Sequence, residues 1–298
     1  MKKKILRTFK ILIISSVILI ILSAAGASLL FYFYPRDSVL AMIKSGAEKT
    51  LKRPVQIESL EYSIRGVLLN NVVIYDTLPD GYQVELLKAE EAVIGFSVLS
   101  FIRGERQIDT IYLRGLRFIW EFDKDGNSNV RRLLVDINKD KKPEDQSKKV
   151  RISRILLKDC TLGLVNPPVK FRPLEGEYMI DTAIEFGKDN LVSVTDTRVI
   201  LPHKRGELYP ELEIVTGADF KITGRAKFSD FDLPWTYGFA KKPLTLPYHT
   251  ADGYAEDIEI TKTQVKAHFK GSSTLKGHGK RLNCDGWCTV DLPSKMIY

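Results

Sequence analysis

From residue 55 onward, apolar residues recur at about every second position, a period typical of β-strands with one apolar face. The clearest case is the segment 108–120, whose apolar positions recur in 152–164 at an offset of 44 residues (152 against 108). A looser copy spans 57–74. Each copy predicts an apolar strand, a break at a polar residue or glycine, and a second apolar strand. Because such a unit buries its apolar face only by joining the next one, the pattern predicts a mainly β chain built as an elongated sheet.

The second half continues the same period with more irregular joints. The segments that we predict as strands are 170–180, 191–201, 208–214, 219–228, 252–261, 264–273 and 283–292. A proline-spaced stretch at 233–248 predicts a long connection between two of them. Residues 136–149 carry a run of mixed charges with little apolar surface to bury, which predicts a disordered loop inside a single domain at 55–298.

The first 34 residues have a different pattern. Residues 11–34 contain no charged side chain, and the run is long enough for a membrane-spanning helix, which needs about 20 apolar residues. A basic tail, residues 1–10, precedes it and predicts a cytoplasmic N-terminus with the remainder exported. The alternative is a signal peptide cleaved near 25–27. We favour the uncleaved anchor because the apolar run continues beyond that site.

Residues 35–54 predict a short amphipathic helix. Val39, Leu40 and Ile43 recur at helical spacing, and Pro54 ends the run. This helix lies either beside the membrane or against one end of the sheet, and the sequence does not distinguish the two roles.

The formal net charge of +8 is concentrated before the apolar segment. Five cations lie within the ten residues of the basic tail: Lys2, Lys3, Lys4, Arg7 and Lys10. A nucleic-acid-binding domain would instead carry its cations on the folded part, interleaved with exposed aromatic side chains. The distribution of charge therefore argues against nucleic acid as a partner.

The sequence contains no motif with the spacing of a catalytic or metal site. The segment 123–129 resembles the start of a calcium loop, but its glycine stands at the fourth position and Leu134 occupies the twelfth, where a bidentate Glu belongs. We interpret it as a turn at Asp125–Gly126 followed by a helical turn capped by Asn129. The four histidines lie apart and no nucleophile motif occurs. We therefore expect no enzymatic activity, no catalytic residue, no metal and no cofactor.

Three cysteines occur. Cys160 lies within an apolar strand pattern and is predicted to be a small buried residue. Cys284 and Cys288 flank a hairpin-like turn at 285–287 that would bring the two sulfurs together in an oxidising compartment. Whether they form a disulfide stays open, because sequence does not fix connectivity.

The order of these parts carries a family resemblance. Residues 52–57 end the amphipathic helix with Lys-Arg-Pro-Val-Gln-Ile, and 66–74 follow with Gly-Val-Leu-Leu-Asn-Asn-Val-Val-Ile. A short helix at 96–103, a strand at 108–113 and the stretch 118–134, with Asp-Gly-x-x-Asn inside it, complete the pattern. Up to about residue 164 the chain thus resembles the AsmA-like family of inner-membrane-anchored periplasmic proteins of two-membrane bacteria. The resemblance is weaker beyond that point.

The resemblance implies a curved, antiparallel β-sheet that forms an open groove in the periplasm, behind an inner-membrane anchor. It implies a relation to chorein-type, bridge-like lipid-transfer proteins and a role in outer-membrane lipid homeostasis or assembly. The implied partners are a phospholipid or another acyl-chain lipid, the inner membrane, and other envelope proteins at the ends of the groove. About 14 strands spaced by ~4.8 Å would extend only ~65 Å, which is short for a bridge between two membranes.

Strand parity selects the candidates for the lipid-binding groove, for which plain sheet core is the alternative. They are Val67, Leu69, Ile111, Leu113, Phe118, Trp120, Leu162 and Leu164. A second hypothesis for the chain is a structural or interaction module that assists outer-membrane protein assembly through its sheet edges. A third, an exported hydrolase, would require a buried histidine and carboxylate group that the sequence does not reveal.

Overall fold

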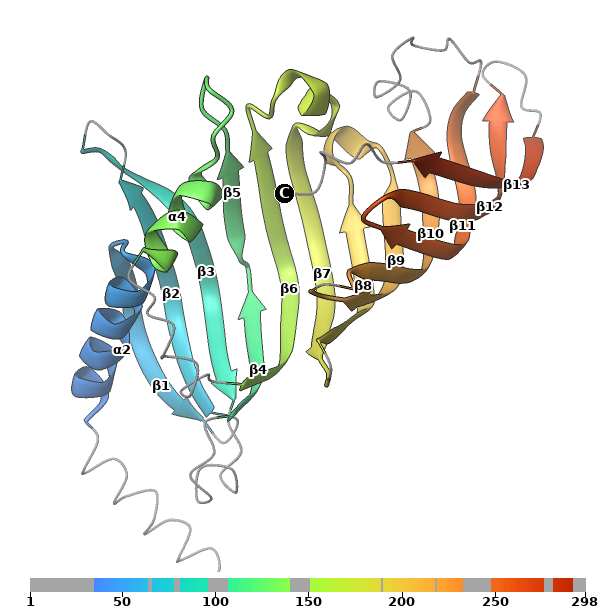
Figure 1. Ribbon diagram of the computed structural model, residues 1–298. Coiled ribbons are helices and arrows are strands. Elements are labelled where there is room, and N and C mark those ends of the chain that lie inside the picture. Colours follow the sequence, from blue (N-terminus) through green and yellow to red (C-terminus); the bar gives the residue numbers. More distant parts are fainter. Residues whose placement is uncertain are drawn as a thin grey trace, which may run out of the picture. The chain divides into compact units, whose positions relative to one another are not determined.

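The computed structural model in Figure 1 describes residues 35–63, 66–77, 81–95, 107–139, 151–188, 190–217, 219–232, 248–275 and 281–291. The chain divides into two compact units, Met1–Ala47 and Glu48–Tyr298. The basic tail 1–10, the apolar segment 11–34 and the short helix expected at 96–103 lie outside the described residues. Within the described ranges, no helix combines the length and the apolar character needed to cross a membrane.

The helix expected within 35–54 is present as α2 (Arg36–Leu51). It begins after Pro35, whose carbonyl accepts hydrogen bonds from the N–H groups of Ser38 and Val39. Asp37 lies in the first turn, where a negative charge favours the positive end of the helix dipole. The helix ends at Lys52, which adopts a left-handed φ of 55° and donates its N–H to the Glu48 carbonyl.

The described part of the second unit contains thirteen strands in one extended, curved sheet (Figure 1). The strands are β1 (Val55–Ser63), β2 (Gly66–Thr77), β3 (Gln83–Gly95), β4 (Gln107–Arg114), β5 (Arg117–Glu121), β6 (Arg151–Val165), β7 (Gly176–Phe186), β8 (Leu191–Ile200), β9 (Glu207–Val215), β10 (Lys221–Asp232), β11 (Tyr248–Thr261), β12 (Gln264–Leu275) and β13 (Arg281–Asp291). Neighbours in space are mostly neighbours in sequence. The mainly β class is therefore confirmed. Several predicted boundaries differ, most of all at 170–180, which begins as the 3-10 helix η2 (Val169–Leu174) before β7 starts.

The described sheet is antiparallel, as expected, except at one joint, where the two copies of the sequence repeat pair in parallel. The segment 108–120 forms β4 and β5, and both pair in parallel with β6, which contains the copy 152–164. Ile108 pairs with Ile152 and Phe118 with Leu162, so the sequence offset is also the pairing register. A parallel pair needs a long crossover connection, and the residues between β5 and β6, including α4 (Asn129–Asn138), supply it. The looser copy, 57–74, instead forms the antiparallel pair β1–β2.

Several strands contain an Asn or Asp with positive φ in their interior. These residues are Asn71 in β2, Asp159 in β6, Asp196 in β8, Asp230 in β10 and Asp257 in β11. Four of the five lie at shifts of the pairing register, all except Asn71. Asn and Asp adopt the left-handed conformation more readily than other non-glycine residues, and an extra residue there bends and twists the strand. The polar break in the second copy of the repeat, at Asp159, is thus one of four bulges that bend the sheet.

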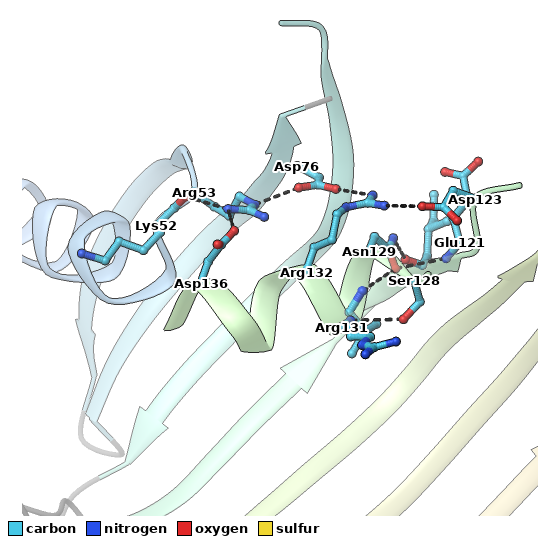
Figure 2. Close-up of polar contacts among 12 residues, drawn as sticks. Lys52, Arg53, Asp76, Glu121, Asp123, Ser128, Asn129, Arg131, Arg132 and Asp136 are labelled. Atoms are coloured by element: carbon cyan, nitrogen blue, oxygen red, sulfur yellow. Dashed lines mark hydrogen bonds and ion pairs between the residues drawn. The ribbon is translucent and has the colours of Figure 1, made fainter. Parts of the chain in front are cut away.

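Ion pairs centred on the buried carboxylate of Asp76 connect α4 to the end of β2 (Figure 2). Asp76 at the end of β2 is 2% exposed and accepts hydrogen bonds from Arg53 Nε at 2.8 Å and from Arg132 Nη2 at 3.1 Å. Arg53 also pairs with Asp136 of α4 at 3.0 Å. Because α4 continues to Asn138, the expected loop at 136–149 is wrong for its first residues, and 140–150 lie outside the described residues.

The calcium-like segment forms the turn that precedes α4. Asp123 Oδ1 accepts hydrogen bonds from the backbone N–H groups of Asp125 and Asn127, so this carboxylate closes the turn. The helix cap is Ser128, whose hydroxyl accepts from the N–H of Arg131, and the predicted cap at Asn129 is wrong by one residue. Asn129 instead bonds the backbone of β5, donating to the Ile119 carbonyl at 2.7 Å.

Large buried side chains are concentrated at one end of the sheet. The buried aliphatic residues of β1 to β3 that are larger than alanine are Val55, Leu60, Val67, Leu69, Val73 and Leu86. Beyond β3 the described buried hydrophobic residues are small, apart from Leu201. They are Cys160, Ala183, Ala251, Ala255 and Ala267. From β4 onward, the described residues therefore form a single layer of sheet without a packed second layer.

Candidate functional site

The eight groove candidates lie on one face of the sheet. Residues that pair directly across strands share a face, so the register traces each face from strand to strand. Followed across the strands, the pairing leads from every candidate to an even-numbered residue of β7. Alternate residues of one strand point to the same face, so all eight candidates share a face. The links are Val67–Ile94–Ile111–Ile155–Ile184, Leu69–Ala92–Leu113–Leu157–Thr182, Phe118–Leu162–Tyr178 and Trp120–Leu164–Gly176.

The candidates differ in how far the protein covers them. Val67 and Leu69 are 8% and 5% exposed, so these two belong to the packed end of the sheet. Trp120 is 37% exposed and stacks on Phe122 with ring centroids 5.7 Å apart. The candidates on β4, β6 and the start of β5 are half-buried. Of the two interpretations, sheet core therefore fits the β2 pair, and an open surface fits the other candidates.

The same face continues apolar far beyond the candidates. One row of directly paired residues runs through ten strands, and a second runs from β6 to β13; neither contains a charged residue. The rows are Tyr62–Val67–Ile94–Ile111–Ile155–Ile184–Val194–Leu212–Gly224–Ile258 and Cys160–Ile180–Val199–Leu208–Phe228–Gly253–Gly271–Cys284. We call this surface the apolar face. Sequence reasoning chose candidates only from the repeat and missed its continuation through β7 to β13.

Several large side chains of the apolar face are exposed to solvent among the described residues. Phe186 on β7, Phe269 on β12 and Leu282 on β13 lie on this face and are 41%, 38% and 48% exposed. Soluble proteins rarely expose a continuous apolar surface larger than a few hundred Å², and such surfaces mark sites of contact with a ligand, a membrane or a partner. The face is therefore the candidate site.

The opposite face carries a ladder of cross-strand ion pairs. The pairs are Arg154–Glu185 at 3.3 Å, Lys158–Asp181 at 2.7 Å, Arg198–Glu207 at 2.7 Å, Arg225–Glu211 at 2.6 Å, Lys221–Glu259 at 3.1 Å and Lys270–Glu256 at 2.9 Å. Each is partly exposed and contributes little to stability. We call this the charged face. Its role is to keep one side of a single-layer sheet in water.

Two open hollows border the charged face in the C-terminal half. The first, about 390 Å³, is lined by Tyr209, Glu211, Arg225, Lys227, Tyr254 and Glu256. The second, about 680 Å³, includes Glu185, Glu213 and Asp257 among its lining residues. None of the eight groove candidates lines either hollow. The first hollow lies among residues of the charged face, whereas the second also includes Val194, Leu212 and Gly224 of the ten-strand apolar row.

One ion pair of the charged face gives a pH prediction. Arg198 binds Glu207 with two hydrogen bonds, of 3.0 and 2.7 Å, and the Tyr209 hydroxyl donates a third. These bonds lower the pKa of Glu207 to about 2. Because the folded pKa is below the ordinary value of 4.5, the pair stabilises the fold above pH 4.5 and this contribution is lost as the pH falls through about 2.

Carboxyl NMR of the Glu207 side chain measures this pKa directly. We expect a midpoint near 2 that rises in 1 M salt, because both partners are partly exposed. In Arg198→Met the midpoint should return towards 4.5. A wild-type midpoint near 4.5 would show that the pair does not form in solution.

The predicted turn between Cys284 and Cys288 is wrong. Both cysteines lie within the continuous strand β13, they point to the apolar face, and both thiols are free. Four residues of extended strand separate their Cα atoms by about 13 Å. A disulfide needs Cα atoms within about 7 Å, so these two cannot pair with each other in this strand. Cys160 is buried as expected, and burial raises the pKa of its thiol.

The described residues were searched for clusters of polar side chains that could hold a metal ion or catalyse a reaction. Within them, no group of three His, Cys, Asp or Glu side chains is placed to hold a metal ion. The buried polar residues in the described ranges are Asp76, Ser128, Asn129, Thr182 and Thr197. His268 binds Asp285 at 2.6 Å and stacks on Trp287, on the charged face. The buried histidine and carboxylate group that the hydrolase hypothesis requires does not occur among these residues.

Comparison of the chain with protein-family models, curated proteins and solved structures finds no match.

Proposed function

We propose that this protein binds lipids by laying their acyl chains along the apolar face of its sheet. The observation that carries this proposal is the uncharged row of paired residues through ten strands, from Tyr62 to Ile258, which the described residues leave largely uncovered beyond β3. Acyl chains gain free energy from any continuous apolar surface, whereas lipid head-groups stay in water. The function requires no reacting group, cofactor or metal.

The dimensions of the face support a lipid as the ligand. Ten strands spaced by ~4.8 Å extend the row over about 43 Å. One leaflet of a bilayer has a hydrocarbon thickness of about 15 Å, half of the ~30 Å core. The face is therefore long enough for more than one lipid, arranged along the direction in which the strands follow each other.

The finer proposal follows the AsmA-like resemblance. In it, residues 11–34 anchor the chain in the inner membrane, the sheet lies in the periplasm, and the apolar face guides phospholipids in outer-membrane lipid homeostasis or assembly. The charge-free run at 11–34 supports the membrane anchor in this proposal. A face of this length spans part of the distance between two membranes, so other envelope proteins or further copies would have to extend it.

Extraction of bound lipid tests the proposal. The double variant Phe118→Asp with Trp120→Asp places two charges on the apolar face, and we expect the lipid recovered by mass spectrometry from the purified full chain to fall at least 5-fold. The matched control is Ile119→Asp with Glu121→Asp, because these alternate residues of β5 lie on the opposite face. The control should retain bound lipid.

Circular dichroism must show that both variants stay folded. Equal lipid in the double variant and the wild type would refute the proposal. If the wild type carries no lipid but cross-links to one protein partner, the alternative holds, namely a structural module that assists outer-membrane protein assembly through its sheet edges.

A further inference from the structure

Among the described strands, β13 is the last in the sheet (Figure 1). On one side β13 pairs with β12 along eleven residues, from Arg281 to Asp291, and among the described residues no strand pairs with its other side. An edge strand offers a row of backbone N–H and C=O groups to another strand, and proteins usually protect such edges with charges, prolines or bulges. β13 contains no proline and no register shift, and its charged residues are Arg281, Asp285 and Asp291, so it is a long, regular edge that carries three charges.

We propose that β13 pairs with β13 of a second copy of this chain, antiparallel and about a two-fold axis through Gly286. In this register the positions of each pair are equally distant from residue 286. Cys284 therefore lies directly opposite Cys288 of the second copy, and Cys288 opposite Cys284. The same residues of both copies form the contact, as two-fold symmetry requires.

The geometry of a β-ladder suits a disulfide at each of these two pairs. Directly opposed residues of antiparallel strands have Cα atoms about 4.5–5.5 Å apart. Disulfides connect Cα atoms that are about 4.4–6.8 Å apart. Both cysteines are exposed and point to the same face, and Gly286 between them carries no side chain that would crowd the two sulfur pairs. Cys284 and Cys288 are too far apart for a disulfide within one strand, but their positions permit two disulfides between the two copies.

Among the other residues of β13, this register places Asp285 opposite Trp287, whereas two further pairs join complementary residue types. It pairs Arg281 with Asp291, residue types of opposite charge, and Leu282 with Val290, both apolar. Asn283 is paired with Thr289. A shift of the axis to residue 285 would oppose Asp285 to itself, and a shift to 287 would oppose each cysteine 288 to a glycine. The axis at Gly286 is the one that joins opposite charges, apolar residues and cysteines at once.

This pairing would make one continuous sheet of two chains. A two-fold axis perpendicular to the sheet leaves both apolar faces on the same side, so the row that ends at Cys284 continues into the second copy. The assembled face would be twice as long as that of one chain. The inference goes beyond lipid binding, and it stands or fails independently because it concerns the sheet edge alone.

The covalent step is a thiol oxidation. At each cysteine pair the two S–H bonds break, one S–S bond forms, and two protons and two electrons pass to an oxidant. In the test below the oxidant is diamide, whose N=N bond takes up both to become a hydrazine. In an oxidising compartment, an oxidised thiol–disulfide exchange protein would accept them by having its own disulfide reduced.

The test uses the full chain in detergent, with Cys160→Ser to remove the third thiol. Under reducing conditions, light scattering after size exclusion should give twice the chain mass of 33.8 kDa, corrected for detergent. After diamide, mass spectrometry should identify one cross-linked peptide pair that joins Cys284 to Cys288. Cys284→Ser alone should lower the covalent dimer at least 10-fold, because it leaves each Cys288 opposite a serine.

Two further variants fix the register. Gly286→Cys, in a chain that lacks the other three thiols, should restore the covalent dimer through its own symmetry-related copy. Arg281→Asp should reduce cross-linking at least 5-fold by opposing two acids, and Arg281→Asp with Asp291→Arg should restore it, because the exchanged charges meet again only across the axis. A monomer at 50 µM under reduction, or cross-links that join Cys284 to Cys284, would overturn the proposal.

Discussion

Replacing Asp76 with alanine is expected to destabilise the protein by about 3 kcal/mol. The side chain is 2% exposed and binds Arg53, which is 10% exposed, together with Arg132. Its removal leaves two guanidinium groups close together without the carboxylate between them, and breaking a buried ion pair by removing one partner is costly. Arg53 keeps Asp136, and Arg132 is 39% exposed and lies near Asp123, so the loss should be at the lower end of the range for buried pairs. For a domain of this size the midpoint of thermal unfolding should fall by roughly 6–12 °C. Denaturant titration followed by circular dichroism measures the free energy of unfolding.

Asp136→Ala is the matched control. Asp136 pairs with the same Arg53, but its side chain is 26% exposed, so we expect a loss of about 1 kcal/mol or less. An equal loss in the free energy of unfolding in both variants would show that the burial of Asp76 does not increase its contribution to stability. In that case the attachment of α4 would depend on its apolar contacts and not on the buried carboxylate.

Placing a lysine in the middle of the apolar face should slow lipid transfer about 10-fold or more. Val194 lies inside the ten-strand row, as its seventh residue, between Ile184 on β7 and Leu212 on β9. An ammonium group there must either lose its hydration or hold water on the path of the acyl chains, and both raise the barrier to movement. A 10-fold slower rate corresponds to about 1.4 kcal/mol. Transfer of a fluorescent phospholipid between vesicles, catalysed by the purified chain, measures the rate.

Ser193→Lys provides the control for that variant. Ser193 precedes Val194 in β8 but points to the charged face, where it lies between Glu185 and Glu213. A lysine at this position is expected to be neutral or stabilising, and the transfer rate should change less than 2-fold. Equal slowing by both lysines would mean that charge anywhere on the sheet is harmful, and the assignment of the transport path to the apolar face would fail.

The sequence predicted much of the β architecture because alternation is a local property. Each strand needs apolar residues at every second position to present one apolar face, so Phe118 and Trp120, or Leu162 and Leu164, could be assigned a common face without knowledge of the fold. The positions that the sequence marked as breaks are real as well. Asp159 interrupts β6 as a bulge, in the conformation that Asn and Asp tolerate best.

Features that depend on distant pairing could not be predicted. The repeat at 108–120 and 152–164 showed two similar segments, but strand direction is decided by the connection between them, and only a helical turn at the start of α4 was predicted. The prediction of a turn between Cys284 and Cys288 was wrong because strand pairing overrode a local preference. Asp285–Gly286 favours a turn locally, yet eleven consecutive pairs with β12 hold the segment extended.

The extent of the apolar face was also hidden, because bulges change strand parity. Asp257 inserts a residue in β11, so Ala255 and Ile258 lie on the same face although their numbers differ in parity. Counting alternate positions along the sequence would have placed them on opposite faces. Only the register, strand by strand, shows that the face from β7 to β13 is as free of charge as the repeat.

Site-specific photo-cross-linking in living cells tests the central claim most directly. A photoreactive amino acid is placed at two adjacent positions in each of β6, β8 and β9: Ile155, Val194 and Leu212 on the apolar face, and Leu156, Ser193 and Glu213 on the charged face. After irradiation, mass spectrometry of the purified chain should find phospholipid adducts at the first three positions and none at the other three. Equal adducts on both faces, or protein adducts alone on the apolar face, would contradict lipid binding along the sheet.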